Sequence, residues 1–482
     1  MEHPRIEITH RDYSPWVLLI PLAILLGTIL LKPMPLYGGF ADDFRYLAGA
    51  QCLECLPTNH WERRFALVWP TGVAIRWFGQ NTWSVMLAPM IAGIAAVTLT
   101  FKLVEWHYGR LSGLIAATVL ALTPVFIDRS MRISIDVIEL AFLLGAVFVL
   151  QRRKGHFWAG ALLALAVLCR PTMLAALPMV ALLAWWQDRR HLPWFAAGFA
   201  APILIEALAY FIAAGDPLYP WRLSLNHMAA WRESMELHQY AAFMSPEVDT
   251  TQSPLLNRNF IDGWVPTSGI DTHWTVQGFV NLFFNVECGM TLISALALGI
   301  LAAKKLDRLQ VGLIISAALY FATLTYVLAV DPRPRMFLPI IVICAALIGS
   351  LGPQLWYWPY KIVVGLFLFL IPFMGLLKVV NRSDFSLAAE QADKLLSERP
   401  YQVTENARQR LSLLRQEFPQ EGRDLIEIDN KCPPRLQGRW LTRRDGRLCI
   451  YTSFPWPFEP YRNGVEQWGR ETPWMLWPPN RC

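Results

Sequence analysis

Apolar segments long enough to cross a lipid bilayer recur along this chain, and they restrict its fold more than any other feature. A membrane span needs about 20 mostly apolar residues in a helix, because hydrocarbon offers the backbone no water to bond. The composition agrees, since 54% of the 482 residues are hydrophobic and only 17% are charged. We expect an α-helical polytopic membrane protein with about 11 transmembrane helices, at residues 15–31, 82–104, 111–127, 133–150, 156–169, 171–187, 193–214, 279–302, 309–330, 336–351 and 357–378.

The positive charges between these segments predict their orientation. Cytoplasmic loops carry an excess of Lys and Arg. Here the basic loops occur after every second span, so they all lie on the same face of the membrane. The basic residues in these loops are Lys102 and Arg110, Arg152, Arg153 and Lys154, Arg189 and Arg190, and Lys304, Lys305 and Arg308. Residues 1–14 are polar and lead into a span with no small-residue exit site, which favours a retained anchor over a cleaved signal peptide. The loops 32–81 and 215–278 and the tail 380–482 are then outside.

The tail has the composition of a small folded domain. Residues 387–397 and 404–418 have the periodicity of amphipathic helices, and residues 425–428, 439–441 and 448–451 are typical of short strands. We therefore expect a transmembrane catalytic domain at 1–379 and a soluble α+β domain at 380–482. Lys and Arg are spread over the loops rather than massed on one face, which argues against nucleic-acid binding.

The cysteines favour disulfides over a metal centre. Cys52 and Cys55 form a C-x-x-C in the first loop, but no second C-x-x-C completes a zinc site. In an oxidising compartment Cys52, Cys55 and the tail cysteines Cys432 and Cys449 would form disulfides. The remaining cysteines in apolar runs, Cys169, Cys288 and Cys344, are expected to be buried.

Polar side chains gather at the predicted outer face. They are Asp42 and Asp43 after the first span, His60, Arg63 and Arg64 in the first loop, Arg129, Arg132, Asp136 and Glu139 at the start of the fourth span, Arg170 at a break, Asp216 in Gly-Asp-Pro-Leu-Tyr-Pro, and Asp331, Arg333 and Arg335. The spacing of Arg129, Arg132, Asp136 and Glu139 predicts one stripe on a single helix. Each group has a structural alternative, such as a helix cap, an ion-pair ladder, a turn or headgroup contact. Their gathering on one face favours a functional site.

The chemistry that fits is transfer of a sugar from a phosphate-linked lipid. A glycosyl phosphate leaves as an anion, so arginines are needed to receive its charge. An acceptor hydroxyl is a weak nucleophile, so a carboxylate base is needed beside the sugar. One base and a leaving group that needs no proton give a single displacement with inversion.

Several short motifs carry a family resemblance over about residues 15–350. They are Asp42-Asp43-Phe44-Arg45-Tyr46, Trp61-Glu62-Arg63-Arg64, Trp69-Pro70, Arg129 to Asp136, Arg170-Pro171-Thr172, Gly215-Asp216-Pro217 and Arg335-Met336-Phe337-Leu338-Pro339. In order and predicted topology they resemble the GT-C-fold glycosyltransferases, especially bacterial lipid A aminoarabinose transferases and protein O-mannosyltransferases. The resemblance implies a GT-C-like fold in a bacterial inner membrane, a polyprenyl-phosphate sugar donor, and a periplasmic active site and C-terminal domain.

The resemblance also implies roles for individual residues. Asp42 falls on the catalytic base, with Asp43 beside it, and Arg63 or Arg64 falls on the basic residue that contacts the donor phosphate. The aminoarabinose enzymes usually have Lys-Pro where this chain has Arg-Arg, so the sugar is left open.

From the residues themselves, we assign Arg333 and Arg335 to the phosphate, Asp43 and Asp136 to substrate hydroxyls, and Arg129 and His60 to substrate binding. Paired carboxylates can bind Mg²⁺ or Mn²⁺, but we expect no cofactor to be required, because the arginines already supply positive charge. The acceptor is expected to be a lipid-linked glycan or a lipopolysaccharide component.

Two other functions remain open from the sequence. A flippase or transporter of lipid-linked sugars would show inverted repeats and charges at the membrane midplane, whereas the charges here gather at one face. An O-antigen ligase or polymerase would use a pyrophosphate-linked donor with arginines and a histidine in a large outer loop, for which His227, His238 and His273 are candidates.

Overall fold

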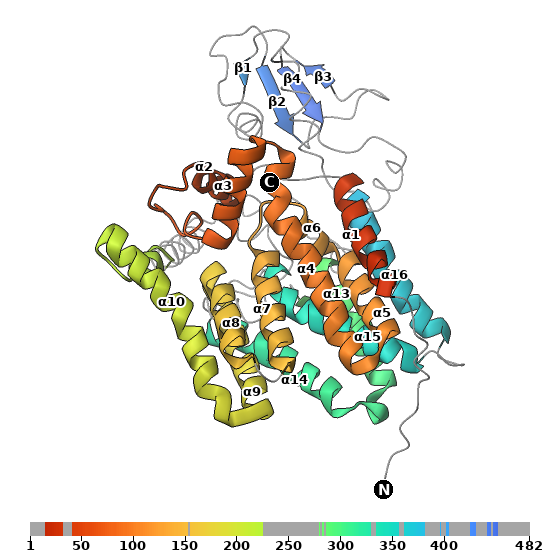
Figure 1. Ribbon diagram of the computed structural model, residues 1–482. Helices are drawn as coiled ribbons and strands as arrows, with labels where there is room; N and C mark the ends of the chain where they lie inside the picture. The colour runs from red at the N-terminus through yellow and green to blue at the C-terminus, as the bar shows by residue number, and fades with distance from the viewer. Residues whose placement is uncertain are drawn as a thin grey trace, which may run out of the picture.

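Helices make up most of the chain (Figure 1). The computed structural model describes residues 15–31, 41–152, 155–224, 279, 282–283, 286–328, 334–355, 361–380, 396, 402–403, 425–429, 441–444 and 447–451. The α-helices are α1 Leu19–Leu31, α2 Ala41–Gln51, α3 Phe65–Phe78, α4 Thr82–Tyr108, α5 Arg110–Leu122, α6 Pro124–Ser130, α7 Asp136–Gln151, α8 His156–Cys169, α9 Leu177–Asp188, α10 Leu192–Ala214, α13 Val286–Leu301, α14 Arg308–Ala322, α15 Leu338–Leu355 and α16 Lys361–Val380.

Several of these helices are long and apolar enough to cross a membrane. Within the described residues four segments qualify, namely Thr82–Tyr108, Pro171–Ala214, Arg308–Val327 and Pro334–Leu355. A fifth qualifies if α5 and α6, which are bent by 70° at their junction, count as one span. Shorter apolar helices include Trp16–Leu30, Phe65–Phe78, His156–Cys169 and Met290–Leu301. The chain therefore has the helices of a multi-pass membrane protein, while the count of 11 spans stays a prediction.

The predicted stripe on the fourth span is wrong, because the helix breaks there. Pro124 has no backbone N–H to continue α5, so a new short helix, α6, starts at that residue and ends at Ser130. The chain then turns, and α7 starts at Asp136. Arg129 is therefore on α6, Arg132 is in the turn, and only Asp136 and Glu139 are on α7.

The first predicted loop, residues 32–81, contains the helices α2 and α3. Asp43, Tyr46, Leu47 and Ala50 are buried along one side of α2, as the spacing of an amphipathic helix requires. α2 packs on α3, and α3 packs on α4. Asp42 and Asp43 thus lie in the first turn of a helix, where the dipole favours carboxylates.

The other helices of the bundle pack against one another in pairs. α4 packs against α5 and α7, α7 against α8, and α8 against α10, while the buried helix α15 packs on α5 and α13. Gly160 of α8 and Gly198 of α10 let these two backbones touch, since a Cβ on either would collide with the other helix. α8 and α10 therefore run side by side, both leading toward the end of the bundle where α2 and α3 lie (Figure 1).

The described part of the tail contains a four-stranded sheet of order β1-β2-β4-β3, made by β1 Gln402–Val403, β2 Leu425–Asp429, β3 Leu441–Arg444 and β4 Arg447–Tyr451. β4 is parallel to β2 and antiparallel to β3. The predicted strands at 425–428 and 448–451 are confirmed as β2 and β4, whereas β3 shares only Leu441 with the predicted strand 439–441, whose other two residues lie outside the described residues. The two amphipathic helices predicted at 387–397 and 404–418 also lie outside the described residues, apart from Leu396.

Candidate active site

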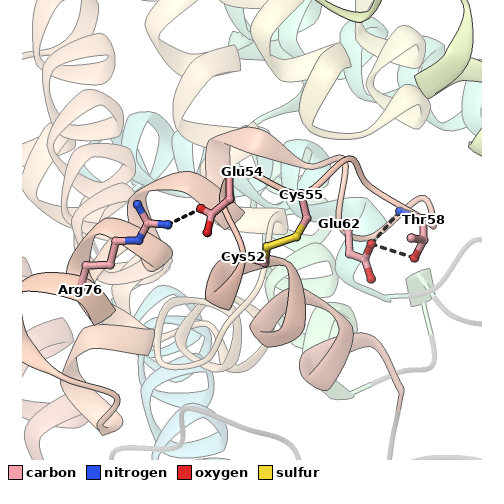
Figure 2. Close-up of a disulfide and its surroundings, with 6 residues drawn as sticks. All are labelled: Cys52, Glu54, Cys55, Thr58, Glu62 and Arg76. Carbon is pink, nitrogen blue, oxygen red and sulfur yellow. Dashed lines mark hydrogen bonds and ion pairs between the residues drawn. A yellow bond between two sulfur atoms is a disulfide. The ribbon is translucent and has the colours of Figure 1, made fainter. Parts of the chain in front are cut away.

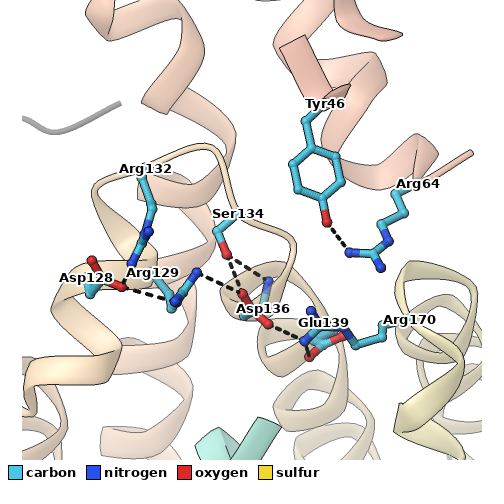
Figure 3. Close-up of polar contacts among 9 residues, drawn as sticks. All are labelled: Tyr46, Arg64, Asp128, Arg129, Arg132, Ser134, Asp136, Glu139 and Arg170. Carbon is cyan, nitrogen blue, oxygen red and sulfur yellow. Dashed lines mark hydrogen bonds and ion pairs between the residues drawn. The ribbon is translucent and has the colours of Figure 1, made fainter. Parts of the chain in front are cut away.

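A cluster of buried charges lies where α6, α7 and α8 meet (Figure 3). Asp136 is at its centre, 1% exposed. It accepts hydrogen bonds from Arg170 at the end of α8 and from Ser134 Oγ at 2.5 Å. Arg129 Nη1 lies 3.7 Å from its other side, on Oδ2. Two arginines and a serine thus hold one carboxylate in a fixed position.

A second carboxylate extends the cluster toward α6. Asp128 is paired with Arg132, four residues later, and with Arg129, whose Nε lies 3.2 Å away. Arg129 consequently bridges Asp128 and Asp136 (Figure 3). The turn that breaks the predicted helix is what brings these side chains together.

Glu139 lies one turn along α7 from Asp136. Arg170 Nη1 is 3.5 Å from its Oε1, and its Oε2 is buried with no hydrogen-bond partner among the described residues. The charges of Arg64 and Arg335 also act on Glu139, and that of Arg335 acts on Asp136. A buried carboxylate oxygen left unbonded is costly, so this oxygen is available to a substrate hydroxyl.

The helix with the acidic pair lies next to this cluster. Tyr46 of α2 accepts a hydrogen bond from Arg64 (Figure 3), and its hydroxyl is close enough to interact electrostatically with Arg170. Asp43, 6% exposed, is one turn before Tyr46 on the buried side of α2. The side chain of Asp42 lies outside the described residues.

The adjacent residues Arg63 and Arg64 point to different places. Arg64 joins Tyr46, whereas Arg63 donates to the carbonyl of Pro220 and to Ser224 Oγ at 3.1 Å. Burial lowers the pKa of Arg63, an effect opposed by the nearby Glu206, yet an arginine stays charged in a protein. Only Arg64 of the two reaches the cluster in this conformation.

The loop that presents these arginines is held by its own side chains. Glu62 accepts a hydrogen bond from the backbone N–H of Thr58 at 2.7 Å (Figure 2) and another from Asn59 Nδ2 at 2.6 Å. A disulfide joins Cys52 and Cys55, as the sequence favoured. His60 packs on Trp61, with ring centroids 3.6 Å apart, so its predicted substrate contact stays a prediction.

The remaining predicted residues have mixed outcomes. Arg335 acts on the cluster, while Arg333, His227, His238 and His273 lie outside the described residues. Asp216 folds the turn after α10, where it accepts from Leu218 N at 3.0 Å. A hydrogen bond from Arg222 lowers the pKa of Asp216. That motif has the structural role of a turn in this conformation.

Some members of the cluster escaped the sequence analysis. Tyr46 was quoted within a motif but given no role, and Asp128 and Ser134 were given none because nothing in their spacing marks them before the turn at residues 131–135 is known. Arg170 and Glu139 were noticed as outer-face charges but not assigned to substrate. In the ranges described above, no group of three or more His, Cys, Asp or Glu side chains is arranged to hold a metal ion.

A large apolar cavity lies at the other end of α7. It has a volume of about 1210 Å³ and is lined by α4, α7, α9, α14 and α15. Its polar rim includes Gln151 hydrogen-bonded to His107, and Tyr108 hydrogen-bonded to Asp307 at 3.0 Å. One end of the bundle, here called the charged end, thus buries a cluster of charged side chains, and the opposite end contains the apolar cavity.

Part of the chain matches a described family. Residues 65–214 match the family described as dolichyl-phosphate-mannose-protein mannosyltransferase. The putative mannosyltransferases YkcB and YycA of Bacillus subtilis (strain 168) are 34% and 36% identical to this chain over 80 and 78 residues, which is 16% of this chain and 11% of each relative. These matches confirm the resemblance to protein O-mannosyltransferases over this segment, and the chain spans about a tenth of the length of the curated relatives that it matches.

Solved structures similar to the chain include two membrane enzymes. The oligosaccharyltransferase of Archaeoglobus fulgidus in the apo form superimposes with a TM-score of 0.48 and 14% identity, covering 86% of this chain and 65% of that one. ArnT from Cupriavidus metallidurans bound to undecaprenyl phosphate gives a TM-score of 0.43 and 12% identity, covering 85% of each chain.

Proposed function

We propose that this chain is a GT-C-type glycosyltransferase that moves a sugar from a polyprenyl-phosphate donor to a lipid-linked glycan or lipopolysaccharide component. The reaction takes place at the periplasmic face of a bacterial inner membrane. The match of residues 65–214 to a mannosyltransferase family supports the reaction class, and the lipid phosphate named with ArnT suggests the class of donor.

The observation that carries the proposal is the excess of arginine in the buried cluster. Among the described residues, five arginines, Arg64, Arg129, Arg132, Arg170 and Arg335, act on the three carboxylates Asp128, Asp136 and Glu139, and one further carboxylate, Asp43, is buried nearby on α2. Buried charges are expensive unless they are compensated. A phosphate anion would compensate the surplus positive charge, and guanidinium groups match its oxygens in pairs.

In the proposed step Asp42 removes the proton of the acceptor hydroxyl as that oxygen forms a bond to C1 of the sugar. The bond from C1 to the phosphate oxygen breaks on the opposite side, and the polyprenyl phosphate leaves with the electron pair. Arg64 and Arg335 hold the leaving phosphate, with Arg333 as a further candidate. Attack opposite the leaving group inverts the configuration at C1.

The two carboxylates of α7 have a positioning role in this scheme. Asp136 is already engaged with Arg129, Arg170 and Ser134, so it orients the arginines. Glu139 keeps one buried oxygen for a sugar hydroxyl. No metal is needed in this mechanism, because the arginines supply the positive charge that the leaving phosphate requires.

Donor consumption by the purified protein in lipid nanodiscs tests the proposal. The panel contains polyprenyl-phosphate mannose, polyprenyl-phosphate aminoarabinose and polyprenyl-phosphate glucose, each with an envelope extract as acceptor, and mass spectrometry follows release of polyprenyl phosphate. We expect one phosphate-linked sugar to be consumed, with mannose the first candidate because of the family description. Consumption of a pyrophosphate-linked sugar alone would favour the ligase, and movement of donors across the bilayer without consumption would favour the flippase.

A further inference from the structure

One acidic residue, Glu206, lies among the apolar residues of α10. Its apolar neighbours Leu204, Ile205, Leu208, Phe211 and Ile212 are exposed on the bundle surface. Glu206 instead points inward, and both of its carboxylate oxygens are buried with no hydrogen-bond partner among the described residues. A carboxylate within a membrane helix is costly, and its retention usually marks a functional site.

The charge nearest to Glu206 is that of Arg63. Their charges act on each other, and no hydrogen bond between them is formed. Arg63 is 2% exposed, and its Nη2 is buried without a hydrogen-bond partner in the described part of the chain. A buried guanidinium and a buried carboxylate therefore both have unused hydrogen-bonding capacity in the same place.

Aromatic rings surround these two polar groups. The Arg63 guanidinium lies over the ring of Trp221 at 5.2 Å. Tyr210, one turn after Glu206, interacts electrostatically with both Glu206 and Arg63 and stacks on Tyr219, with centroids 5.8 Å apart. A carboxylate and a guanidinium that can bind paired hydroxyls, flanked by flat apolar rings, suit a sugar ring with its polar edge and apolar faces.

The location agrees with the proposed reaction, on which this inference rests. Arg63 is adjacent in sequence to Arg64, and Cys169 lies within electrostatic reach of Arg63, Arg64, Arg170 and Glu139 together. The charged cluster and the group around Glu206 and Arg63 are therefore both close to the C-terminal end of α8. A substrate could contact the charged cluster and the α10 group at once.

We propose that Glu206 and Arg63, with Trp221 and Tyr210, form a sugar-binding subsite beside the charged cluster. The sugar belongs either to the donor or to the acceptor, since the chemistry of recognition is the same. Glu206 accepts hydrogen bonds from two hydroxyls, Arg63 donates through its unused nitrogen, and Trp221 packs on a face of the ring. This subsite explains why Arg63 and Arg64 diverge.

The test compares Glu206→Gln and Tyr210→Phe with the wild type, and uses Glu105→Gln as the matched control. Glu105 lies in the last turn of α4, far from the proposed subsite in the sequence; its side chain is 18% exposed and is paired with Lys102 and Arg110. Binding of undecaprenyl phosphate and of undecaprenyl-phosphate mannose to each variant in nanodiscs is measured by native mass spectrometry. Quenching of tryptophan fluorescence by methyl α-mannoside is measured with undecaprenyl phosphate bound, as the acceptor probe.

If the donor sugar occupies the subsite, Glu206→Gln weakens binding of undecaprenyl-phosphate mannose by roughly tenfold, as expected for loss of a charge-assisted hydrogen bond, and leaves undecaprenyl phosphate unaffected. If the acceptor sugar occupies it, only the methyl mannoside affinity falls. Tyr210→Phe weakens the same affinity by less, and Glu105→Gln changes neither the donor affinity nor the methyl mannoside affinity.

Wild-type affinities in both Glu206→Gln and Tyr210→Phe would overturn the inference while leaving the proposed function standing. Failure of the wild type to bind any of the three phosphate-linked sugars in the donor panel would count against the proposed function itself.

Discussion

The two ends of α7 carry charge in opposite ways. At its start, Asp136 and Glu139 are buried, and they are paired with arginines from α6 and α8. At its end, Gln151 lies at the rim of an apolar cavity, and the nearby ion pairs of Glu105 are partly exposed. Burying ions costs several kcal/mol each, whereas exposed pairs contribute little either way. Within the described residues around α7, the large cost falls at its start, as a reaction site requires and a purely structural bundle does not.

The largest effect on turnover is expected at the charged end, where replacing the proposed base Asp42 should cost more than replacing its neighbour Asp43. Asp42→Asn should reduce the rate of sugar transfer by about 10²–10⁴-fold, the usual range for loss of a general base. Asp43→Asn should cost less, because Asp43 is buried on the side of α2 that carries Tyr46. Release of polyprenyl phosphate by each purified variant measures this. Near-normal turnover by Asp42→Asn would remove Asp42 from the role of base.

Stability should also differ between the two ends. Arg170→Ala leaves Asp136 and Glu139 without their shared partner, and breaking a buried pair in this way costs about 3–5 kcal/mol. Unfolding in mixed detergent–SDS micelles gives the free energy of unfolding. A loss below about 1 kcal/mol would show that the cluster is solvated and that the contrast between the ends is smaller than its burial suggests.

Replacing an arginine with lysine tests whether the charged cluster needs the paired hydrogen bonds of guanidinium groups or only their positive charge. Arg64→Lys and Arg335→Lys keep the charge but lose paired contacts to phosphate oxygens. We expect donor binding to weaken by roughly 1–3 kcal/mol, the range for hydrogen bonds to charged groups, and turnover to fall. Arg63→Lys should act mainly on the sugar-bearing donor or on the acceptor. Titration with undecaprenyl phosphate separates these effects, and unchanged affinity in both Arg64→Lys and Arg335→Lys would return those arginines to a structural role.

The smallest effect is expected at the other end of the bundle. Arg110 lies 3.0 Å from Glu105, and its side chain is 36% exposed. Arg110→Ala should change the free energy of unfolding by less than about 1 kcal/mol, as is usual for exposed ion pairs, and should leave turnover unchanged. The same micelle experiment checks it; a loss as large as that of Arg170→Ala would erase the distinction between the two ends.

The sequence predicted best where local chemistry decides the structure. The limits of α8 agree exactly with the predicted segment 156–169, because Arg170-Pro171 ends that helix for steric reasons. The strands β2 and β4 follow from their alternating apolar residues. The sequence also singled out Arg129, Arg132, Asp136 and Glu139 as a group, but the single helical stripe predicted for them is wrong because the helix breaks between Ser130 and Asp136.

The features that escaped prediction depend on tertiary packing. Arg63 and Arg64 bind Pro220 and Tyr46, which are far apart in the sequence, so no spacing rule predicts that the two side chains diverge. The helices α2 and α3 were not predicted within the first loop, since neither segment is long enough to span a membrane. Glu206 was overlooked, although a signal exists, since it is the only charged residue in the predicted span 193–214. In a membrane segment such a residue is itself a reason to look for a site.

One measurement tests most directly whether the charged end of the bundle is where the donor binds. A polyprenyl-phosphate analogue with a photoreactive diazirine beside the phosphate is irradiated with the wild-type protein, and the labelled peptides are identified by mass spectrometry. The account predicts labels on α2, on residues 60–64 and on residues 334–337, around Tyr46, Arg64 and Arg335. Labels confined to Trp106, Tyr108 and Val311, which line the apolar cavity, would contradict it and place the lipid phosphate at the opposite end.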